Sequence, residues 1–258
     1  MKTEFFPIAA FKDNYIWLIR HIQSSQTLIV DPGEAAPVLQ ALRRLNLKPI
    51  GILVTHHHAD HTAGIPELKQ HYTLPVYGPT IEAQAHVTHP LKEGDFLRFP
   101  ELCLTLHVFD TPGHTLGHIM YYGQGCLLTG DTLFTGGAGR LFEGTALQLW
   151  QSLQKVKKLP PETLIYCGHE YTEANLKFAK MVEPNNLYIQ SRLEEVSYRR
   201  LQGLPTVPST LFSELATNPF LRTGELNLKK SVEAHFNKIE NKETGIFSLL
   251  REWKNQYS

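Results

Sequence analysis

The chain has 258 residues, of which 42% are apolar and 19% are charged, and its formal net charge at pH 7 is zero. This composition is typical of a globular protein, and the neutral balance argues against a strongly basic nucleic-acid binder or an acidic disordered tail. The length predicts one main domain and a smaller one. Three cysteines, far apart and without a C-x-x-C pair, argue against a disulfide framework and against a thiolate zinc site.

The N-terminal segment, residues 1–19, is interrupted by charges at Glu4, Lys12 and Asp13. It is therefore predicted to be neither a secretory signal nor a membrane span. Together with the cysteine pattern, this predicts a cytoplasmic protein that does not bind membranes.

Residues 1–170 alternate short apolar runs with helical patterns, which is typical of a layered α/β domain. The runs at 14–20 and 26–30 are strand-like, and 34–46 has helical spacing. The continuous apolar run at 50–54 predicts a strand that is buried on both faces. The other expected elements are helices at 65–72 and 145–157 and strands at 96–99, 102–109, 118–122, 125–129 and 163–167.

The remaining residues, 171–258, show helical patterns with a break at 204–208. They contain no Asp, a residue that favours turns and caps over helix interiors. The sequence therefore predicts two parts, an α/β domain at 1–170 and a helical domain at 171–258.

The stretch THHHADHTAG, residues 55–64, places four histidines and one aspartate in six consecutive positions after an apolar run. Protonated imidazoles this close together would repel one another, and a bound cation gives them a reason to be together. In an extended loop alternate residues share a side, so His56 and His58 face one way and His57 is expected not to be a ligand. Asp60 is either a helix N-cap or a ligand, and its place beside candidate ligands favours the ligand.

Further donors are expected at the ends of other apolar strands, beside glycine, where α/β domains tend to place their sites. His114 in TPGHTLGH, Asp131 in TGD and His169 in CGHE have this placement, and His118 is a candidate for orienting a ligand. The candidate donors are then His56, His58, Asp60, His61, His114, Asp131 and His169. One catalytic metal takes about three protein ligands, so this set predicts two divalent metal ions that share one carboxylate. Nitrogen and oxygen donors suit zinc, iron or manganese.

The motifs THHHADHTAG, TPGHTLGH, TGDTLF and CGHEYT together resemble the metallo-β-lactamase superfamily over residues 1–170. This resemblance implies an α/β fold, an αββα sandwich with metals at one edge of two β-sheets. GRLFEGT at 139–145, GHEYT at 168–172, the helical tail and LREWK at 250–254 extend the match to essentially the whole chain. These segments resemble the glyoxalase II (hydroxyacylglutathione hydrolase) family.

The family resemblance implies a thioester hydrolase that converts S-D-lactoylglutathione and related S-(2-hydroxyacyl)glutathiones to glutathione and the 2-hydroxy acid, D-lactate. This is the second step of methylglyoxal detoxification. Residues 1–170 would form the catalytic domain, and the C-terminal helical domain, 171–258, would bind the glutathione part of the substrate. A hydroxide that bridges the two metals would be the nucleophile.

The resemblance also implies roles for single residues. One metal would be held by His56, His58 and His114, the other by Asp60, His61 and His169, with Asp131 bridging. Zinc is expected before iron or manganese, and Asp60 and Asp131 would act in catalysis through the metals.

The glutathione contacts implied by the family are Arg140, Phe142, Tyr171, Arg251 and Lys254. Phe142 lacks the hydroxyl of the Tyr that animal members carry, whereas Arg140 keeps a positive charge. Arg251 and Lys254 are three positions apart and share a helix face, for which a solvated helix end is the alternative interpretation.

Other functions fit these motifs less well. A lactonase would share the superfamily site, and a one-iron persulfide dioxygenase would use fewer of the donors. An RNA-processing nuclease would want a basic surface, which the zero net charge argues against. A non-catalytic zinc module is typically closed and Cys-rich, unlike this donor set. No feature requires a partner chain, so a monomer is expected.

Overall fold

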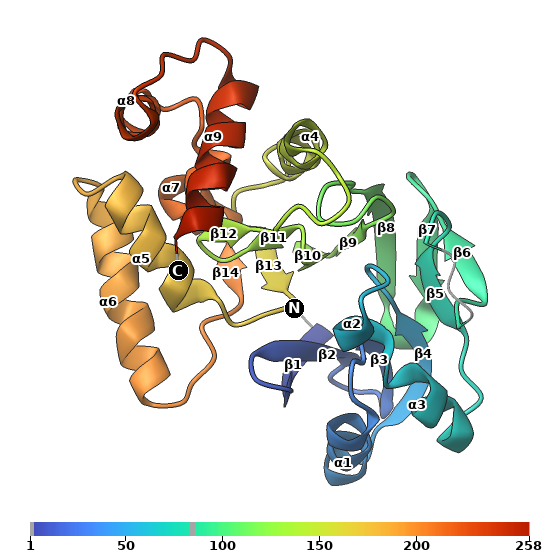
Figure 1. Cartoon of the computed structure of the whole chain (residues 1–258). Coiled ribbons are helices and arrows are strands. Elements are labelled where there is room, and N and C mark those ends of the chain that lie inside the picture. Colours follow the sequence, from blue (N-terminus) through green and yellow to red (C-terminus); the bar gives the residue numbers. More distant parts are fainter. Residues whose placement is uncertain (1–2, 83–85, 258) are drawn as a thin grey trace. The chain divides into compact units, whose positions relative to one another are not determined.

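The computed structural model describes residues 3–82 and 86–257 of the chain (Figure 1). Its contacts divide the chain into two compact units, one of Met1–Asp110 with Thr115–Gly130 and the other of Thr111–His114 with Asp131–Ser258. The chain therefore passes from one unit to the other at three points. The domain border at 170/171 is not one of these points, and it stays a prediction from the sequence.

The first unit contains a sheet with the strand order β1-β2-β3-β4-β5-β6. The pairs β1–β2 and β2–β3 are antiparallel, and the pairs from β3 to β6 are parallel. The strands are β1 (Thr3–Ala10), β2 (Asn14–His21), β3 (Gln26–Val30), β4 (Lys48–Leu53), β5 (Val76–Pro79) and β6 (His89–Leu91).

Strand β4 lies between two parallel neighbours, as expected for its continuous apolar run. Ile52 and Leu53 are completely buried. Strand β1 had not been predicted, because Glu4 and Pro7 interrupt its apolar pattern. It is the edge strand of the sheet, where a proline without an N–H is tolerated.

Helices α1 (Ala35–Leu45) and α3 (Ile65–His71) pack against this sheet in one hydrophobic core. Val38 and Leu42 of α1 lie four positions apart, and at most 1% of the surface of either residue is exposed. Burial of such a side chain stabilises the fold by about 1.5–3 kcal/mol. Helix α1 ends at Asn46, which adopts the left-handed conformation that closes many helices.

The first unit also contains antiparallel strands in the order β7-β8-β9-β10. They are β7 (Phe96–Phe99), β8 (Leu104–Asp110), β9 (Ile119–Gly123) and β10 (Cys126–Gly130), with the short helices α2 (Ala59–Thr62) and η1 (Pro100–Leu102) elsewhere in the unit. The strands expected near 96–99, 102–109, 118–122 and 125–129 are therefore present.

The second unit is mainly helical, and its residues 171–257 form the helices that their patterns predict. Its helices are α4 (Ala146–Val156), α5 (Thr172–Val182), α6 (Leu187–Leu201), α7 (Leu211–Thr217), η2 (Pro219–Leu221), α8 (Leu226–Phe236) and α9 (Glu243–Gln256). Its strands are β11 (Leu133–Phe134), β12 (Gly137–Ala138), β13 (Leu164–Cys167) and β14 (Ser209–Thr210). Within the described residues, no helix is long and apolar enough to cross a membrane.

Local sequence accounts for where α4 and α6 begin. Thr145 and Gln148 form a reciprocal capping box at the start of α4. The Asn186 side chain accepts hydrogen bonds from two backbone N–H groups at the start of α6. Helix α9 then buries Phe247 and Leu250 in the interior of the unit and packs against α4 and α8.

Candidate functional site

The histidine cluster lies on the segment that joins β4 to the short helix α2. His56 and His61 are almost completely buried, whereas His57 and His58 are half-buried. The residue at the N-cap position of α2 is His58, so the N-cap interpretation of Asp60 is wrong.

Asp31 organises the cluster from the end of β3. Its carboxylate accepts hydrogen bonds from the backbone N–H and the hydroxyl of Thr55, at 2.8 and 2.7 Å. Its Oδ2 also lies 3.1 Å from Nδ1 of His61. Because a carboxylate accepts, this contact places the proton of the neutral ring on Nδ1 and leaves Nε2 with a lone pair for a ligand.

His56 is oriented in a similar way. The Thr55 hydroxyl donates to Asp31, so its oxygen can accept from Nδ1 of His56, 3.0 Å away. The lone pair of His56 then lies on Nε2, which is 3.1 Å from Nδ1 of His58. Two ring nitrogens at this distance need a proton or a cation between them, which fits a pair of metal ligands.

Asp60 and His118 complete this part of the first unit. The Asp60 carboxylate accepts a hydrogen bond from the Asn14 amide at 2.9 Å, and it lies 3.4 Å from Nε2 of His61. The completely buried His118 ring stacks on His56, with centroids 4.9 Å apart. His118 thus lies beside a candidate ligand, and a role in orienting it stays a prediction.

The second unit contains the other candidate donors, His114, Asp131 and His169. Nε2 of His114 and Nε2 of His169 lie 3.5 and 3.3 Å from Oδ2 of Asp131. Nδ1 of His114 lies 2.8 Å from the carbonyl oxygen of Arg140, which can only accept. The proton of the neutral His114 ring is therefore on Nδ1, and Nε2 is the ligand atom.

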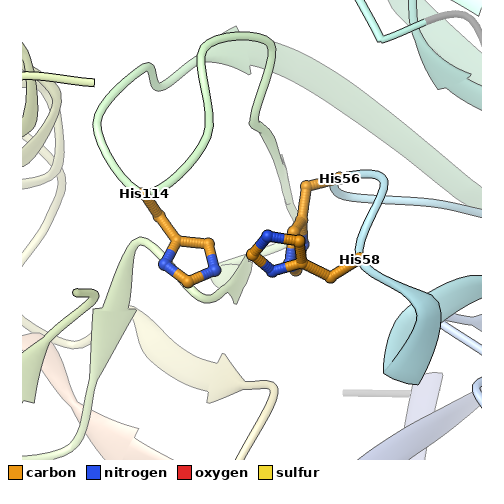
Figure 2. Close-up of side chains that lie close together, drawn as sticks. All are labelled: His56, His58 and His114. Atoms are coloured by element: carbon orange, nitrogen blue, oxygen red, sulfur yellow. The ribbon is translucent and has the colours of Figure 1, made fainter. Parts of the chain in front are cut away.

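These side chains have the chemistry of a metal site. Donor atoms of Asp31, His56 and His61 lie within 4.8 Å of one another in the first unit. Figure 2 shows His56 and His58 on the segment before α2 and His114 on a separate loop. Imidazole nitrogens and carboxylate oxygens bind divalent ions such as zinc, iron or manganese. The chain thus contains groups of histidine and aspartate able to hold metal ions.

Arg251 in α9 is buried, with only 6% of its surface exposed. Its Nη1 donates to the carbonyl oxygens of Ala138 and Gly139, at 2.8 and 3.3 Å. Burial, and to a lesser degree the charge of Arg140, lowers the pKa of Arg251 to about 10. The alternative interpretation of a solvated helix end is therefore wrong for Arg251.

Lys254 lies one turn further along α9. Its Nζ is 5.0 Å from the ring centroid of Phe178 and 5.1 Å from that of Tyr257. Burial, and then the charge of Arg251, lowers the pKa of Lys254 to about 8.

The other predicted substrate contacts differ in exposure. Arg140 is exposed, and the Phe142 ring is 62% exposed with its centroid 5.2 Å from that of His114. The half-buried Tyr171 ring stacks on His169 with centroids 4.7 Å apart. Two of the predicted substrate contacts therefore neighbour candidate metal ligands.

Comparison with known proteins gives the family. Residues 11–169 match the metallo-beta-lactamase superfamily, and residues 170–257 match the hydroxyacylglutathione hydrolase C-terminus. A hydroxyacylglutathione hydrolase from Nitrosomonas eutropha is 51% identical over 255 residues, which cover 98% of each chain. The chain belongs to the hydroxyacylglutathione hydrolase family.

Solved structures agree with this hydrolase family's fold. ETHE1 from Myxococcus xanthus matches with a TM-score of 0.69 and 25% identity, over 99% of this chain and 92% of that one. TTHA1623, solved in a di-iron-bound form, matches with a TM-score of 0.60 and 25% identity, over 84% of this chain and 100% of that one. The predicted fold class, α/β and metallo-β-lactamase-like with C-terminal helices, is confirmed.

Two residues of this hydroxyacylglutathione hydrolase family member had not been predicted to act near the site. Asp31 follows an apolar strand and precedes Pro-Gly, the same placement that identified the other donors, so the sequence contained a signal for it. Asn14 begins a strand and has no such signal. Its role follows only from the fold, which brings it to Asp60.

Proposed function

We propose that this chain hydrolyses thioesters of glutathione with 2-hydroxy acids, S-D-lactoylglutathione among them, to glutathione and the free acid. The observation that carries the proposal is the 51% identity with a hydroxyacylglutathione hydrolase over 98% of both chains. The match includes the helical C-terminal part, residues 170–257, which is the part assigned to binding glutathione.

The proposal includes two divalent metal ions, zinc in the first place, with iron or manganese as alternatives. His56, His58 and His114 are assigned to one ion, Asp60, His61 and His169 to the other, and Asp131 to both. Two structural observations support this assignment. Nδ1 of His61 and Nδ1 of His114 already donate hydrogen bonds, which leaves Nε2 of each ring for a metal ion. Asp131 also lies beside both His114 and His169. Bound ions of this kind lower the pKa of water toward about 7 and polarise a carbonyl group.

The chain's own residues have distinct parts in the reaction. Hydrolysis adds the hydroxyl of water to the acyl carbon, breaks the C–S bond and leaves the glutathione sulfur with a proton. Asp60 is assigned to accept the proton of the water, because Asn14 holds its carboxylate next to His61. Asp31 keeps His61 and, through Thr55, His56 in the orientation that they need as ligands.

Glutathione has two carboxylates, which cationic side chains can bind. Arg140 is exposed and is assigned to one of them, with Lys254 and Arg251 as the further cations. Arg251 already donates to two backbone carbonyls, so part of its role is to fix the segment before Arg140. Tyr171 is assigned to pack against the substrate, and Phe142 offers a ring but no hydroxyl.

The test is hydrolysis of S-D-lactoylglutathione by the purified protein, with the metal content measured on the same sample. We expect about two ions per chain and a kcat/KM within the range of about 10⁴–10⁸ M⁻¹s⁻¹ that enzymes show. Two ions with no turnover of glutathione thioesters, but turnover of acyl-homoserine lactones, would replace the proposed substrate with a lactone. The predicted monomer and the predicted cytoplasmic location need separate measurements, sedimentation and cell fractionation.

A further inference from the structure

Three groups of the candidate site depend on one short hairpin, residues 131–140. These groups are the Asp131 carboxylate at its start, the Arg140 side chain at its end and the Arg140 carbonyl, which accepts the hydrogen bond that orients His114. The hairpin contains only the two-residue strands β11 and β12, which pair with each other. Strands this short are too weak to hold a fixed geometry without outside support.

Arg251 binds the carbonyls of Ala138 and Gly139 near the end of the hairpin. The central part of the hairpin is bound by three other polar side chains of the helical region, Asn175, Glu214 and Asn218. The Asn218 amide donates to the carbonyl oxygens of Phe134 and Gly137, at 3.1 and 2.9 Å. Its Nδ2 also lies 3.0 Å from Oε2 of Glu214.

The other two side chains bind the turn of the hairpin. Oε2 of Glu214 accepts a hydrogen bond from the Gly136 N–H at 2.8 Å. The Asn175 amide donates to the carbonyl of Thr135 at 3.2 Å. Backbone groups of four successive residues, 134–137, are thus bound by these three side chains.

The hairpin fits its surroundings closely. A Cβ atom added to Gly137 would lie 2.5 Å from the Asn175 amide, and one added to Gly139 would lie 1.9 Å from the carbonyl oxygen of Asp131. A shift of the hairpin would therefore be passed on directly to Asp131.

Stability alone does not explain these side chains. Glu214 and Asn218 are completely buried, and Asn175 is 6% exposed. A buried carboxyl group destabilises a fold relative to an apolar side chain of similar size. Burial also raises the pKa of Glu214. The group is better explained by the geometry that it imposes on the backbone of the hairpin.

We propose that Asn175, Glu214 and Asn218 are positioning residues for the hydrolysis, which act through the hairpin on Asp131 and on the Arg140 carbonyl. They contact the backbone of the hairpin and have no assigned contact with metal or substrate. The proposal rests on the proposed function only in that Asp131 and His114 are taken as metal ligands.

The first experiment compares Asn218→Ala with Asn186→Ala. The two side chains have the same kinds of partner, because each accepts from the backbone at a helix start and donates to a backbone carbonyl. Asn218 accepts from one N–H group and donates to two carbonyls, whereas Asn186 accepts from two N–H groups and donates to one carbonyl. Only Asn218 binds the hairpin. Asn218 is completely buried and Asn186 is half-buried, so Asn218→Ala should lose more thermal stability, and both variants are measured well below their unfolding temperatures.

For Asn218→Ala we expect metal affinity, measured by competition with a chelator, to fall about 10–100-fold, with a parallel fall in kcat. Amide hydrogen exchange at residues 133–138 should accelerate. Asn186→Ala should leave metal affinity, kcat and hairpin exchange unchanged. If the two variants keep the same metal affinity and exchange rates, the proposal is wrong.

A second pair tests Glu214. Gln at this position keeps an oxygen that accepts from Gly136, so Glu214→Gln should stay within about threefold of the unsubstituted protein in metal affinity. Glu214→Leu removes the acceptor and should resemble Asn218→Ala. Equal metal affinities in these two variants would contradict the proposal. If Asn218→Ala does not fold, Asn175→Ala, which loses one bond to the hairpin, takes its place with the same expected signature.

The readouts separate this proposal from the proposed function. Metal affinity and hydrogen exchange do not depend on the substrate, so they decide the positioning role even if no glutathione thioester is hydrolysed. Conversely, rapid turnover of S-D-lactoylglutathione with unaltered metal affinity in Asn218→Ala would sustain the function and reject the positioning role.

Discussion

Hydrogen bonds to the far side of two imidazole rings decide which nitrogen can bind a metal. The Asp31 carboxylate accepts a hydrogen bond from Nδ1 of His61, and the carbonyl of Arg140 accepts one from Nδ1 of His114. These contacts fix the tautomer and the ring orientation of each residue before any ion arrives. A ligand that is already in place loses less conformational entropy when it binds.

Replacement of Asp31 with Asn tests this orientation. Asn tolerates the left-handed backbone that Asp31 adopts, with φ of 51°, so the backbone should be preserved. We expect metal affinity to fall about 10–100-fold because the carboxylate that orients His61 is lost. Chelator competition measures it, and Asp95→Asn, which alters a carboxylate in an exposed turn, is the control. Unchanged affinity in Asp31→Asn would show that His61 needs no such orientation.

His56 and His57 are adjacent and of the same type, so they form a natural pair of variants. His56 is completely buried with both ring nitrogens in contact, and His57 is half-buried. His56→Ala should lose at least one metal ion per chain and nearly all activity. His57→Ala should keep both metal content and activity, as metal analysis and turnover will show. Metal loss in His57→Ala would contradict the expectation that alternate residues of this loop face opposite ways.

Among the elements, those with a clear apolar pattern could be predicted from the sequence, and the two-residue strands β11 and β12 could not. Strand β4 and helix α1 have enough consecutive positions for the pattern to be clear. Strands β11 and β12 have two residues each, and their pairing depends on Asn218, which is about 80 positions away in sequence. Such contacts arise from tertiary structure, so no local pattern reports them.

The site shows the same division. Donors at strand ends were predicted because residue type and position coincide in the sequence. Asn14 and Glu214 were not, because each acts on a residue more than 40 positions away. The burial of Arg251 also depends on its tertiary neighbours, which its place near the end of a helix does not reveal.

Helix α9 gives a pH-dependent prediction through Lys254. Its pKa is about 8 in the folded protein, against about 10.4 for an unperturbed lysine. Between these values the unfolded chain binds more protons than the folded one, so the stability of the folded protein should rise with pH. Denaturant titrations at pH 7–11 give the unfolding free energies of the unsubstituted protein and of Lys254→Met. As the pH rises, the unfolding free energy of the unsubstituted protein should increase relative to that of Lys254→Met. A difference that is constant with pH would rule out the lowered pKa.

For the whole molecule, the family and the fold class could be predicted because motifs along the entire chain resemble one family. The compact units could not, because the sequence places Thr111–His114 amid strands of the first unit although this segment packs with the second. Gly113 approaches Leu149 so closely that a Cβ atom would lie 2.6 Å from the Leu149 Cβ. The carbonyl of Pro112 accepts a hydrogen bond from Ser152. Contacts of this kind are long-range and have no local signature.

Removal of the metal ions should destabilise the whole molecule. An ion that binds only the folded state at a thousand times its dissociation constant contributes about 4 kcal/mol. For a protein of this size that corresponds to a decrease of roughly 10 °C in the unfolding temperature on chelation. Calorimetry with and without chelator measures it, and added zinc should restore the loss.

Asp131→Ala is the matched variant for this measurement. Since Asp131 is assigned to both ions, the variant should bind less metal, lose most activity and respond little to chelator. Full activity with intact metal content in Asp131→Ala would exclude the shared carboxylate.

The three passages of the chain between its units have a consequence for synthesis on the ribosome. Residues 1–130 emerge first and include the whole of the first unit, but Thr111–His114, which belong to the second unit, have as yet no partners. Leu149, Ser152 and the carbonyl of Arg140, which hold this segment, are translated later. A nascent chain that stops at residue 130 thus has a histidine cluster with no fixed His114. The loop that carries His114 is set only after residues up to Ser152 have also left the exit tunnel, and translation adds about 5–20 residues per second.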